Sequence, residues 1–121
     1  MKVLVTGGCG FIGSNFIKYL FSSPEVDSDI FVINVDKQTY AGRGQNLEHM
    51  GFSSNKNYLF IKEDICNKEM FDKVISEHSP EIIFNFAAES HVDRSILDSS
   101  GFVRTNVMGT QVILEAVKEH N

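Results

Sequence analysis

The order of apolar and polar positions along the chain predicts strands that alternate with helices. Short runs rich in Val, Ile, Phe and Tyr indicate strands at residues 3–6, 30–35, 58–61 and 82–86. The run at 30–35 is nearly continuous rather than alternating, which is typical of a parallel strand covered on both faces. Apolar residues at helical spacing indicate helices over 11–21, around 70–75 and from Gly101 or Phe102 to about Lys118. The segment 37–51 is predicted to be irregular or a short helix.

This alternation predicts an α/β fold, a Rossmann-type doubly wound parallel sheet, because consecutive parallel strands need helical crossovers. Right-handed crossovers favour the strand order 3-2-1-4. The first helix is expected to bury one stripe, formed by Ile12, Phe16, Ile17, Leu20 and Phe21. The last helix is expected to bury a stripe formed by Val103, Asn106, Val107, Thr110, Leu114 and Val117. Since Asn106 is polar, the prediction gives it a buried hydrogen-bond partner.

A glycine-rich turn joins the first strand to the first helix. Gly7, Gly10 and Gly13 follow a Val-Leu-Val-Thr run and lead into the helical spacing. In a dinucleotide site such glycines allow a sharp turn, a close approach of pyrophosphate to the backbone, and close packing of helix on strand. The helix N-terminus then offers N–H groups to the phosphates. Asp36, about twenty residues further on, completes the pattern and favours a dinucleotide site over an ordinary turn.

Acidic and small residues follow the later strands in the same way. Asp36 is placed to accept hydrogen bonds from ribose hydroxyls and to repel the 2′-phosphate of NADP, so the sequence favours NAD, although Lys37 and Arg43 lie nearby. Asp64 either accepts from the adenine amino group or caps the helix that follows it. The small residues that begin the segment 87–91 leave room for a ligand ring. Because parallel strands end at one edge of the sheet, these residues predict one ligand site there.

Composition narrows the choice of partners and compartment. The chain has 121 residues, enough for one domain, with 42% hydrophobic and 22% charged residues. Its net charge of −5 argues against nucleic acid and anionic membranes as partners. With no apolar run long enough for a signal peptide or a membrane span, the cytoplasm is the expected location. Cys9 and Cys66 are expected to be free thiols, and Cys9 is interpreted as a small residue that fits rather than as a thiol of lowered pKa.

Three catalytic patterns are not supported by the sequence. His91, Asp93 and Ser95 lie within one short loop, which does not indicate a triad, and no cluster has metal-ligand spacing. Tyr58 and Lys62 have a YxxxK spacing that acts on a helix, but on a strand their Cα atoms would be roughly 13 Å apart. No other Tyr has Lys four positions on. The chain therefore has no predicted catalytic residue and no predicted metal site.

Five segments resemble a known family. They are residues 6–14 (TGGCGFIGS), 34–42 (NVDKQTYAG), 64–66 (DIC), 87–96 (AAESHVDRSI) and 105–110 (TNVMGT). They are similar to extended short-chain dehydrogenase/reductases that act on nucleotide sugars, above all to the 4,6-dehydratases, and the resemblance covers essentially the whole chain. NVDKQTYAG and AAESHVDRSI carry the dehydratase resemblance, whereas the glycine segment is shared by all extended members.

The resemblance implies the residues of a binding site. Together with the three glycines of the turn, the expected NAD contacts are Phe11, Ile12, Asp36, Lys37, Gln38, Thr39, Asp64, Ile65, Phe86, Ala87, Ala88, Glu89, Ser90, Thr105 and Asn106. The expected contacts with a nucleotide-sugar substrate of the dTDP-glucose class are Ser90, His91 and Arg94. From the residues alone, a surface or ion-pair role of Arg94 is at least as good an interpretation, and a loop-stabilising role of Ser90 is a comparable one.

The resemblance also implies a reaction, in which C4 of a glucose unit is oxidised by hydride transfer to NAD, water is eliminated across C5 and C6, and the hydride returns to C6. The family's proton-transfer residues follow a further strand, beyond Asn121. Residues 1–121 are therefore expected to be a partial NAD-binding domain, truncated before the catalytic strand-helix unit, without a substrate domain, and inactive unless a downstream half completes it.

Two alternatives stay open. The first is a nucleotide-sugar 4-epimerase, which uses the same cofactor half. The second is a non-catalytic module that binds NAD or a partner chain, including by self-association through the exposed edge of the fourth strand or through the last helix.

Overall fold

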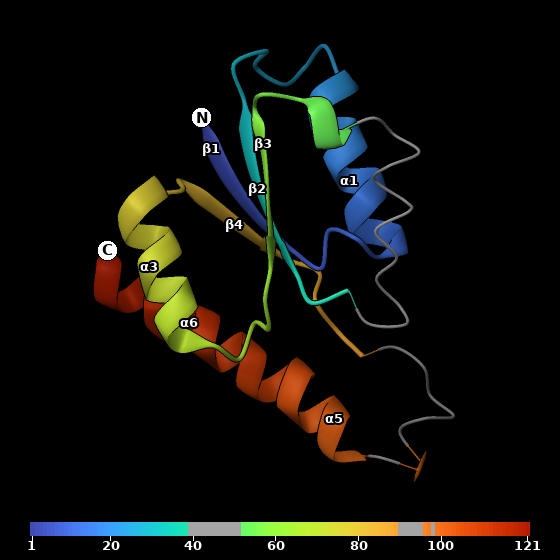
Figure 1. Cartoon of the computed structure of the whole chain (residues 1–121), viewed down its shortest axis with the longest axis vertical. Coiled ribbons are helices and arrows are strands. Elements are labelled where there is room, and N and C mark those ends of the chain that lie inside the picture. Colours follow the sequence, from blue (N-terminus) through green and yellow to red (C-terminus); the bar gives the residue numbers. More distant parts are fainter. Residues whose placement is uncertain (39–51, 90–95, 98) are drawn as a thin grey trace.

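In the computed structural model of the chain, four parallel strands form one sheet in the order β3-β2-β1-β4 (Figure 1). The structure describes residues 1–38, 52–89, 96–97 and 99–121. The strands are β1 (Lys2–Thr6), β2 (Phe31–Asp36), β3 (Tyr58–Lys62) and β4 (Ile82–Asn85). In the register of the sheet, Val3 lies between Val32 and Ile82. The predicted doubly wound sheet and its strand order are confirmed.

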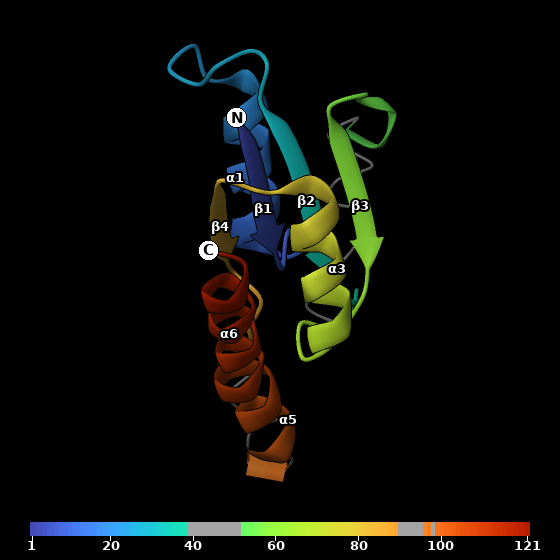
Figure 2. The ribbon, with the colours of Figure 1, turned by 90° about the vertical axis from the view of Figure 1, so that its left-hand side faces the viewer.

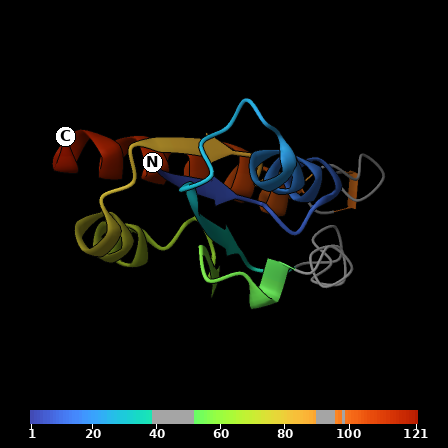
Figure 3. The same cartoon turned by 90° about the horizontal axis from the view of Figure 1, so that it is seen from above.

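Helices cover both faces of this sheet (Figure 2). The helical elements are α1 (Phe11–Ser22), η1 (Phe52–Ser54), α3 (Lys68–His78), α5 (Ser99–Val103), η2 (Arg104–Gly109) and α6 (Thr110–His120). Viewed from above, α1 lies on one side of the strands, while α3 and α6 lie on the other (Figure 3). Among the described segments, none of the helices has the length and apolar character needed to cross a bilayer.

The two faces hold separate cores because successive strand residues point to opposite sides of the sheet. On the α1 face, Val3 of β1 packs in a cluster with Ile17 of α1. On the other face, Leu4 of β1 belongs to a cluster with Phe71 of α3 and Ile113 of α6. All five side chains are buried. Each layer of helices is therefore fixed to the sheet by its own set of apolar contacts.

Two predictions about buried helix faces are wrong. Ile12 is 66% exposed at the start of α1, outside the stripe assigned to it. In the last helix the predicted inward residues are exposed or half-buried, and the buried ones are Thr105, Gly109, Ile113 and Ala116. One cause is that η2 is π-helical, so the helical phase shifts between α5 and α6. The other is that small residues allow close approach, since a Cβ on Gly109 would collide with the side chain of Ile65.

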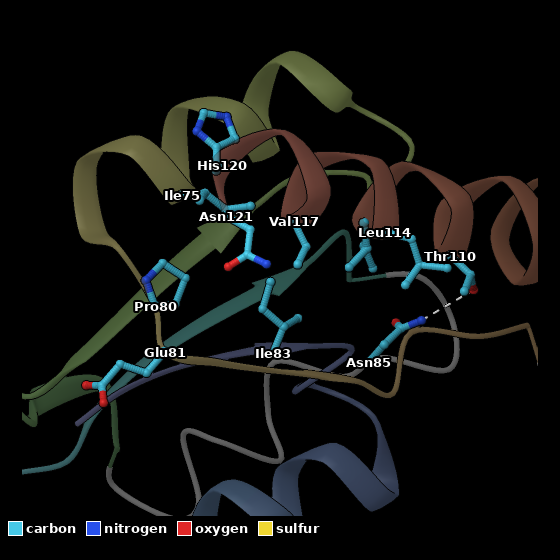
Figure 4. Close-up of a pocket in the computed structure, with 11 residues that line it drawn as sticks. Ile75, Pro80, Glu81, Ile83, Asn85, Thr110, Leu114, Val117, His120 and Asn121 are labelled. Carbon is cyan, nitrogen blue, oxygen red and sulfur yellow. Dashed lines mark hydrogen bonds between the residues drawn. The ribbon is translucent and has the colours of Figure 1, made fainter.

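A groove runs beside β4. Within the part of the chain that the structure describes, no strand pairs with the outer edge of β4, and α6 passes alongside it (Figure 4). The groove has a volume of about 410 Å³, and its lining includes Ile83, Asn85, Thr110, Leu114 and Val117. Three residues of the stripe predicted to be buried, Thr110, Leu114 and Val117, thus line an open groove.

Candidate functional site

The turn after β1 requires glycine at its first position. Gly7 has a φ of +68°, in the left-handed region that side chains disfavour. A Cβ on Gly7 would lie 2.5 Å from the amide nitrogen of Ala87, in the segment that follows β4. The Gly7 N–H donates to the carbonyl of Val35 at 2.9 Å. Gly7 is therefore the point at which the turn contacts both the end of β2 and the segment after β4.

The start of α1 packs closely on this turn, as predicted from the glycine spacing. A Cβ on Gly13 would collide with the carbonyl oxygen of Gly7 and would lie 2.8 Å from the Cα of Gly8. Gly10 is the N-cap of α1, in an extended conformation with φ −74° and ψ 174°, and its helix has no side-chain cap. The first turn of α1 contains no acidic residue. The positive end of the helix dipole therefore carries no carboxylate of its own, which suits an anionic ligand.

Two side chains of β2 hold the middle of the turn. Asn34 and Asp36 are two positions apart on the strand and therefore point to the same face. Oδ1 of Asn34 accepts from the Gly8 N–H at 3.0 Å, and Oδ2 of Asp36 accepts from the Cys9 N–H at 2.9 Å. Asn34 is fully buried and Asp36 is 7% exposed. Buried acceptors thus fix two consecutive amides of the turn.

Asn34 is a site residue that the sequence prediction missed. Its Nδ2 donates to the phenol oxygen of Tyr58 at 2.9 Å, so a tyrosine of β3 helps to orient the amide. The signal was present in the sequence as one amide within the otherwise apolar run at 30–35. A buried amide needs partners for both its oxygen and its nitrogen, and the turn and Tyr58 supply them.

Asp36 lies at the end of β2, as predicted, with its carboxylate held from two sides. Besides the Cys9 N–H, the Gln38 N–H donates to it, reaching Oδ1 at 2.6 Å. Gln38 itself adopts a positive φ of 53°. Each carboxylate oxygen has a second lone pair, so the oriented group can still accept hydrogen bonds from ligand hydroxyls.

Burial governs the acidity of the thiol and the phenol beneath the turn. Burial, assisted by the charge of Asp36, raises the pKa of Cys9 to about 11. Burial also raises the pKa of Tyr58 to about 12. Cys9 is buried, which agrees with its interpretation as a small residue that fits, and neither Cys9 nor Cys66 is part of a disulfide, as predicted. Tyr58 and Lys62 lie on β3, which confirms that their spacing does not form a helical YxxxK pair.

The segment after β4 is tied to β1 and to the last helix. The Thr6 hydroxyl donates to Oδ1 of Asn85 at 2.5 Å and accepts from the Ala87 N–H at 3.3 Å. Oδ1 of Asn106 accepts from the Glu89 N–H at 2.9 Å, and its Nδ2 donates to the Glu89 carbonyl at 3.2 Å. Asn106 thus has hydrogen-bond partners, but the predicted buried interaction is wrong, because both bonds are exposed and Asn106 lies on an exposed face of η2.

Asp64 does not cap α3, so that alternative for its role is wrong. The N-cap is Asn67, whose side chain accepts from an N–H in the first turn of the helix at 3.1 Å. Oδ1 of Asp64 accepts from the Cys66 N–H at 2.9 Å, and Oδ2 lies 3.2 Å from Nη2 of Arg104 and 3.9 Å from Nζ of Lys37. Burial acts to raise the pKa of Asp64, but the Cys66 N–H and the two cations outweigh it and lower that pKa.

The other predicted site residues differ widely in exposure. Phe11 and Ile12 are 80% and 66% exposed at the start of α1, whereas Ile65 and Thr105 are buried. The half-buried ring of Phe86 packs on a phenylalanine of α1, with ring centroids 5.1 Å apart. Four predicted site residues lie outside the described residues, namely Thr39, Ser90, His91 and Arg94. Among the described residues, no group of three or more His, Cys, Asp or Glu side chains is arranged to hold a metal ion.

These features meet at the edge of the sheet where all four strands end (Figure 1). A helix start without its own carboxylate faces the turn, which fits a pyrophosphate. The oriented carboxylate of Asp36 at the end of β2 fits a ribose. Small residues after β4 and two exposed apolar side chains at the start of α1 leave surfaces for flat rings. The arrangement therefore fits a dinucleotide.

Comparisons with known proteins agree with this arrangement. The family described as GDP-mannose 4,6 dehydratase matches residues 4–121. The dTDP-glucose 4,6-dehydratase 1 of Escherichia coli K12 is 42% identical over 120 residues, which are 99% of this chain and 32% of that enzyme. A dTDP-glucose 4,6-dehydratase of Streptomyces venezuelae, solved with NAD bound, is similar with a TM-score of 0.89 at 40% identity, over 99% of this chain and 36% of its own.

A UDP-glucose 4-epimerase of Thermotoga maritima, solved with UDP-glucose, is also similar. Its TM-score is 0.82 at 34% identity, and the match covers 100% of this chain and 35% of the epimerase. The chain thus spans about a third of the length of the relatives it matches.

Proposed function

The chain belongs to the GDP-mannose 4,6 dehydratase family, and from this premise we propose that it is the NAD-binding portion of a nucleotide-sugar 4,6-dehydratase. The proposed substrate is a nucleotide sugar of the dTDP-glucose class, by analogy with the relatives from Escherichia coli and Streptomyces venezuelae. Because the chain spans about a third of those enzymes, the dehydration is proposed for a whole protein and cofactor binding for residues 1–121.

The observation that carries the proposal is the glycine turn held over an oriented carboxylate. Gly7 and Gly13 have no space for a side chain, and the Asp36 carboxylate is fixed by two backbone N–H groups. In the proposal, the turn and the start of α1 bind the pyrophosphate of NAD, and Asp36 binds the hydroxyls of the adenosine ribose. The exposed side chains of Phe11 and Ile12 then cover the bound cofactor from the helix side.

In the proposal, residues 1–121 bind and orient the cofactor. When bound, NAD accepts the hydride that leaves C4 of the sugar. The segment 86–90 after β4 is proposed to support the nicotinamide end of the cofactor, and the side chains of Thr6 and Asn106 hold that segment through hydrogen bonds to its backbone. Ser90, His91 and Arg94 are proposed to contact the nucleotide sugar.

Calorimetry with NAD and NADP tests the cofactor assignment. We expect Asp36→Arg to weaken NAD binding by about tenfold or more, because it removes charge-assisted hydrogen bonds to the ribose, and to improve NADP binding. Asp29→Arg, the same charge change at an exposed position before β2, serves as the control and should leave both affinities unchanged. An unaltered preference in Asp36→Arg would contradict the ribose assignment.

Turnover of dTDP-glucose with NAD tests the assignment of catalysis. The 121-residue chain alone should release no 4-keto-6-deoxy product, whereas a whole protein containing it should. Measurable turnover by the chain alone would sink the proposal that the proton-transfer groups lie in another part of the protein.

An epimerase is a second candidate, because the Thermotoga maritima epimerase is 34% identical with a TM-score of 0.82. The dehydratase is favoured by the higher identity of 40% and TM-score of 0.89 for the Streptomyces venezuelae enzyme. Analysis of the product distinguishes the two, since an epimerase returns the hydride to C4 and retains the oxygen at C6. A 4-epimer formed from the nucleotide sugar by the whole protein would replace the dehydratase assignment.

A candidate of another class is a non-catalytic module that self-associates, and the open edge of β4 favours it. Ile82 on this strand is 41% exposed, and the adjoining groove is lined by apolar residues including Ile83 and Leu114. In this case a second copy of the chain adds to the edge. Sedimentation should then depend on protein concentration, and Ile82→Lys should remove the dependence. A strictly monomeric chain would exclude this candidate.

A further inference from the structure

A carboxylate between two cations lies beside the residue that follows Asp36. Oδ2 of Asp64 is 3.2 Å from Nη2 of Arg104 and 3.9 Å from Nζ of Lys37. Lys37 directly follows β2, Asp64 lies in the turn after β3, and Arg104 is the first residue of η2. Three segments that are distant in sequence thus bring their charged groups together at the ligand edge of the sheet.

The position of Asp64 is fixed by contacts that do not involve the cations. Its Oδ1 accepts from the Cys66 N–H at 2.9 Å, so its own turn orients the carboxylate. The Cys66 thiol donates to the carbonyl of Arg104 at 3.3 Å, which ties the same turn to η2. The close contact of Gly109 with Ile65 holds the other end of η2 against this turn. The carboxylate is therefore built into the site, whereas Lys37 and Arg104 reach it with long side chains.

We propose that Asp64 is a specificity-determining residue, which favours NAD over NADP by neutralising Lys37 and Arg104. This inference rests on the proposed cofactor site at Asp36. A 2′-phosphate needs a cation near the ribose, and Lys37 directly follows the carboxylate assigned to that ribose. While Asp64 engages both cations, neither presents its full charge to a phosphate. Asp36 disfavours NADP by repelling its 2′-phosphate directly. Asp64 disfavours NADP by reducing the attraction of Lys37 and Arg104 for that phosphate.

The expected size of this effect is set by solvent exposure. The side chains of Lys37, Asp64 and Arg104 are 36%, 28% and 54% exposed, so water and salt screen their interactions. Exposed ion pairs change binding or stability by small amounts, which correspond here to about a three- to fivefold change in affinity. We therefore expect a shift in preference for NAD rather than a reversal, and we expect added salt to reduce it.

The test compares the affinities of the 121-residue chain for NAD and NADP by calorimetry. Asp64→Asn keeps an acceptor oxygen for the Cys66 N–H but removes the charge, and it should tighten NADP binding about three- to fivefold while changing NAD binding less. This gain in NADP affinity should disappear when Lys37→Met and Arg104→Met are added, and it should be smaller in 0.5 M salt. Glu63→Gln, the adjacent acid, is the matched control and should change neither affinity.

The outcomes separate this inference from the proposed function. If the unsubstituted chain binds NAD but Asp64→Asn leaves its affinity for NADP unchanged, the inference is overturned and the cofactor site stands. A gain that survives the loss of both cations would overturn it as well, because the gain would then have another source. If the unsubstituted chain binds no NAD, the proposed function fails and the inference fails with it. Urea unfolding of each variant confirms that the compared chains are folded.

Discussion

The glycine turn is held from two sides that differ in burial. On the β2 side, which we call the inner support, Asn34 and Asp36 accept buried hydrogen bonds from the turn, and Asn34 donates a partly buried one to Tyr58. On the β4 side, which we call the outer support, the bonds run from Thr6 to Ala87 and from Asn106 to Glu89. Asn34 is fully buried, whereas Asn106 is exposed.

The difference follows from the position of each strand in the sheet. β2 lies between β1 and β3, so its side chains are covered on both faces by the two cores. β4 pairs with β1 alone among the described strands, and the groove of about 410 Å³ runs along it. The part of the site assigned to pyrophosphate and ribose is thus fixed within the fold. The part assigned to the nicotinamide end is supported from one side, which makes the two supports separable by mutation.

Gly7→Val should disrupt both supports at once and have the largest effect. Valine would take a left-handed φ that costs about 1–2 kcal/mol, and its Cβ would also collide with the Ala87 backbone. We expect a loss of more than about 2 kcal/mol in the free energy of unfolding, measured with urea. Gly10→Ala, at ordinary dihedral angles, should cost within about 0.5 kcal/mol while still weakening NAD binding. Equal losses in the two variants would contradict the special role of Gly7.

Asn34→Leu breaks the inner support alone. Leucine is branched like asparagine but bulkier and apolar, and it leaves the buried Gly8 N–H and the partly buried Tyr58 hydroxyl without their partner. We expect a loss of about 2–4 kcal/mol in the free energy of unfolding. Tyr58→Phe, which removes one hydroxyl, should lower the free energy of unfolding by less than Asn34→Leu does. A loss below about 1 kcal/mol in Asn34→Leu would show that the inner support is not a buried network.

Alkaline pH should weaken the turn that the inner support holds, through the Cys9 thiol. The pKa of Cys9 is about 11 in the folded chain, against 9.0 for an exposed thiol, so the unfolded chain releases this proton first as pH rises. Stability should be unaffected by this group below pH 9 and should fall by up to about 1.4 kcal/mol per pH unit between about pH 9 and 11. Urea midpoints of wild type and Cys9→Ala across this range isolate the contribution. Parallel pH profiles would disprove it.

Asn106→Ala breaks the outer support and should have the smallest effect on stability. Because the side chain is exposed, the free energy of unfolding should fall by less than about 1 kcal/mol. NAD affinity should nevertheless drop by about fivefold, since the backbone of Glu89 loses both hydrogen bonds to the helix. Gln111→Ala, which removes an exposed bond within the adjoining α6, is the control and should leave NAD affinity unchanged. A larger loss of stability than in Asn34→Leu would reverse the order of the two supports.

The sequence was most informative where one local requirement decides the structure. Gly7 and Gly13 are needed because a side chain has no space there, and the spacing of glycines in a strand-turn-helix pattern reports this directly. Strand order follows from crossover handedness, which does not depend on details of side chains. The end of β2 at Asp36 follows from the end of an apolar run.

The sequence was least informative where packing chooses between two options. The last helix is apolar on more than one face, so periodicity did not identify the buried one, and the small residues Gly109 and Ala116 determine close approach instead. Nothing in the local sequence marks η2 as π-helical. The contact of Asp64 with Arg104 joins turns from different parts of the chain and depends on that helical phase. These features can be identified only from the three-dimensional structure.

The position of β1 between β2 and β4 also determines the order in which its contacts form during synthesis. Thr6 on β1 and its partner Asn85 on β4 are 79 residues apart in the chain. At about 5–20 residues per second, a ribosome takes roughly 4–16 s to make the intervening segment. During that interval β1 can pair with β2, and the inner support can form while Gly7 has no contact on its other side. The binding turn is therefore made well before it is completed, because its outer contacts wait for β4 to leave the exit tunnel.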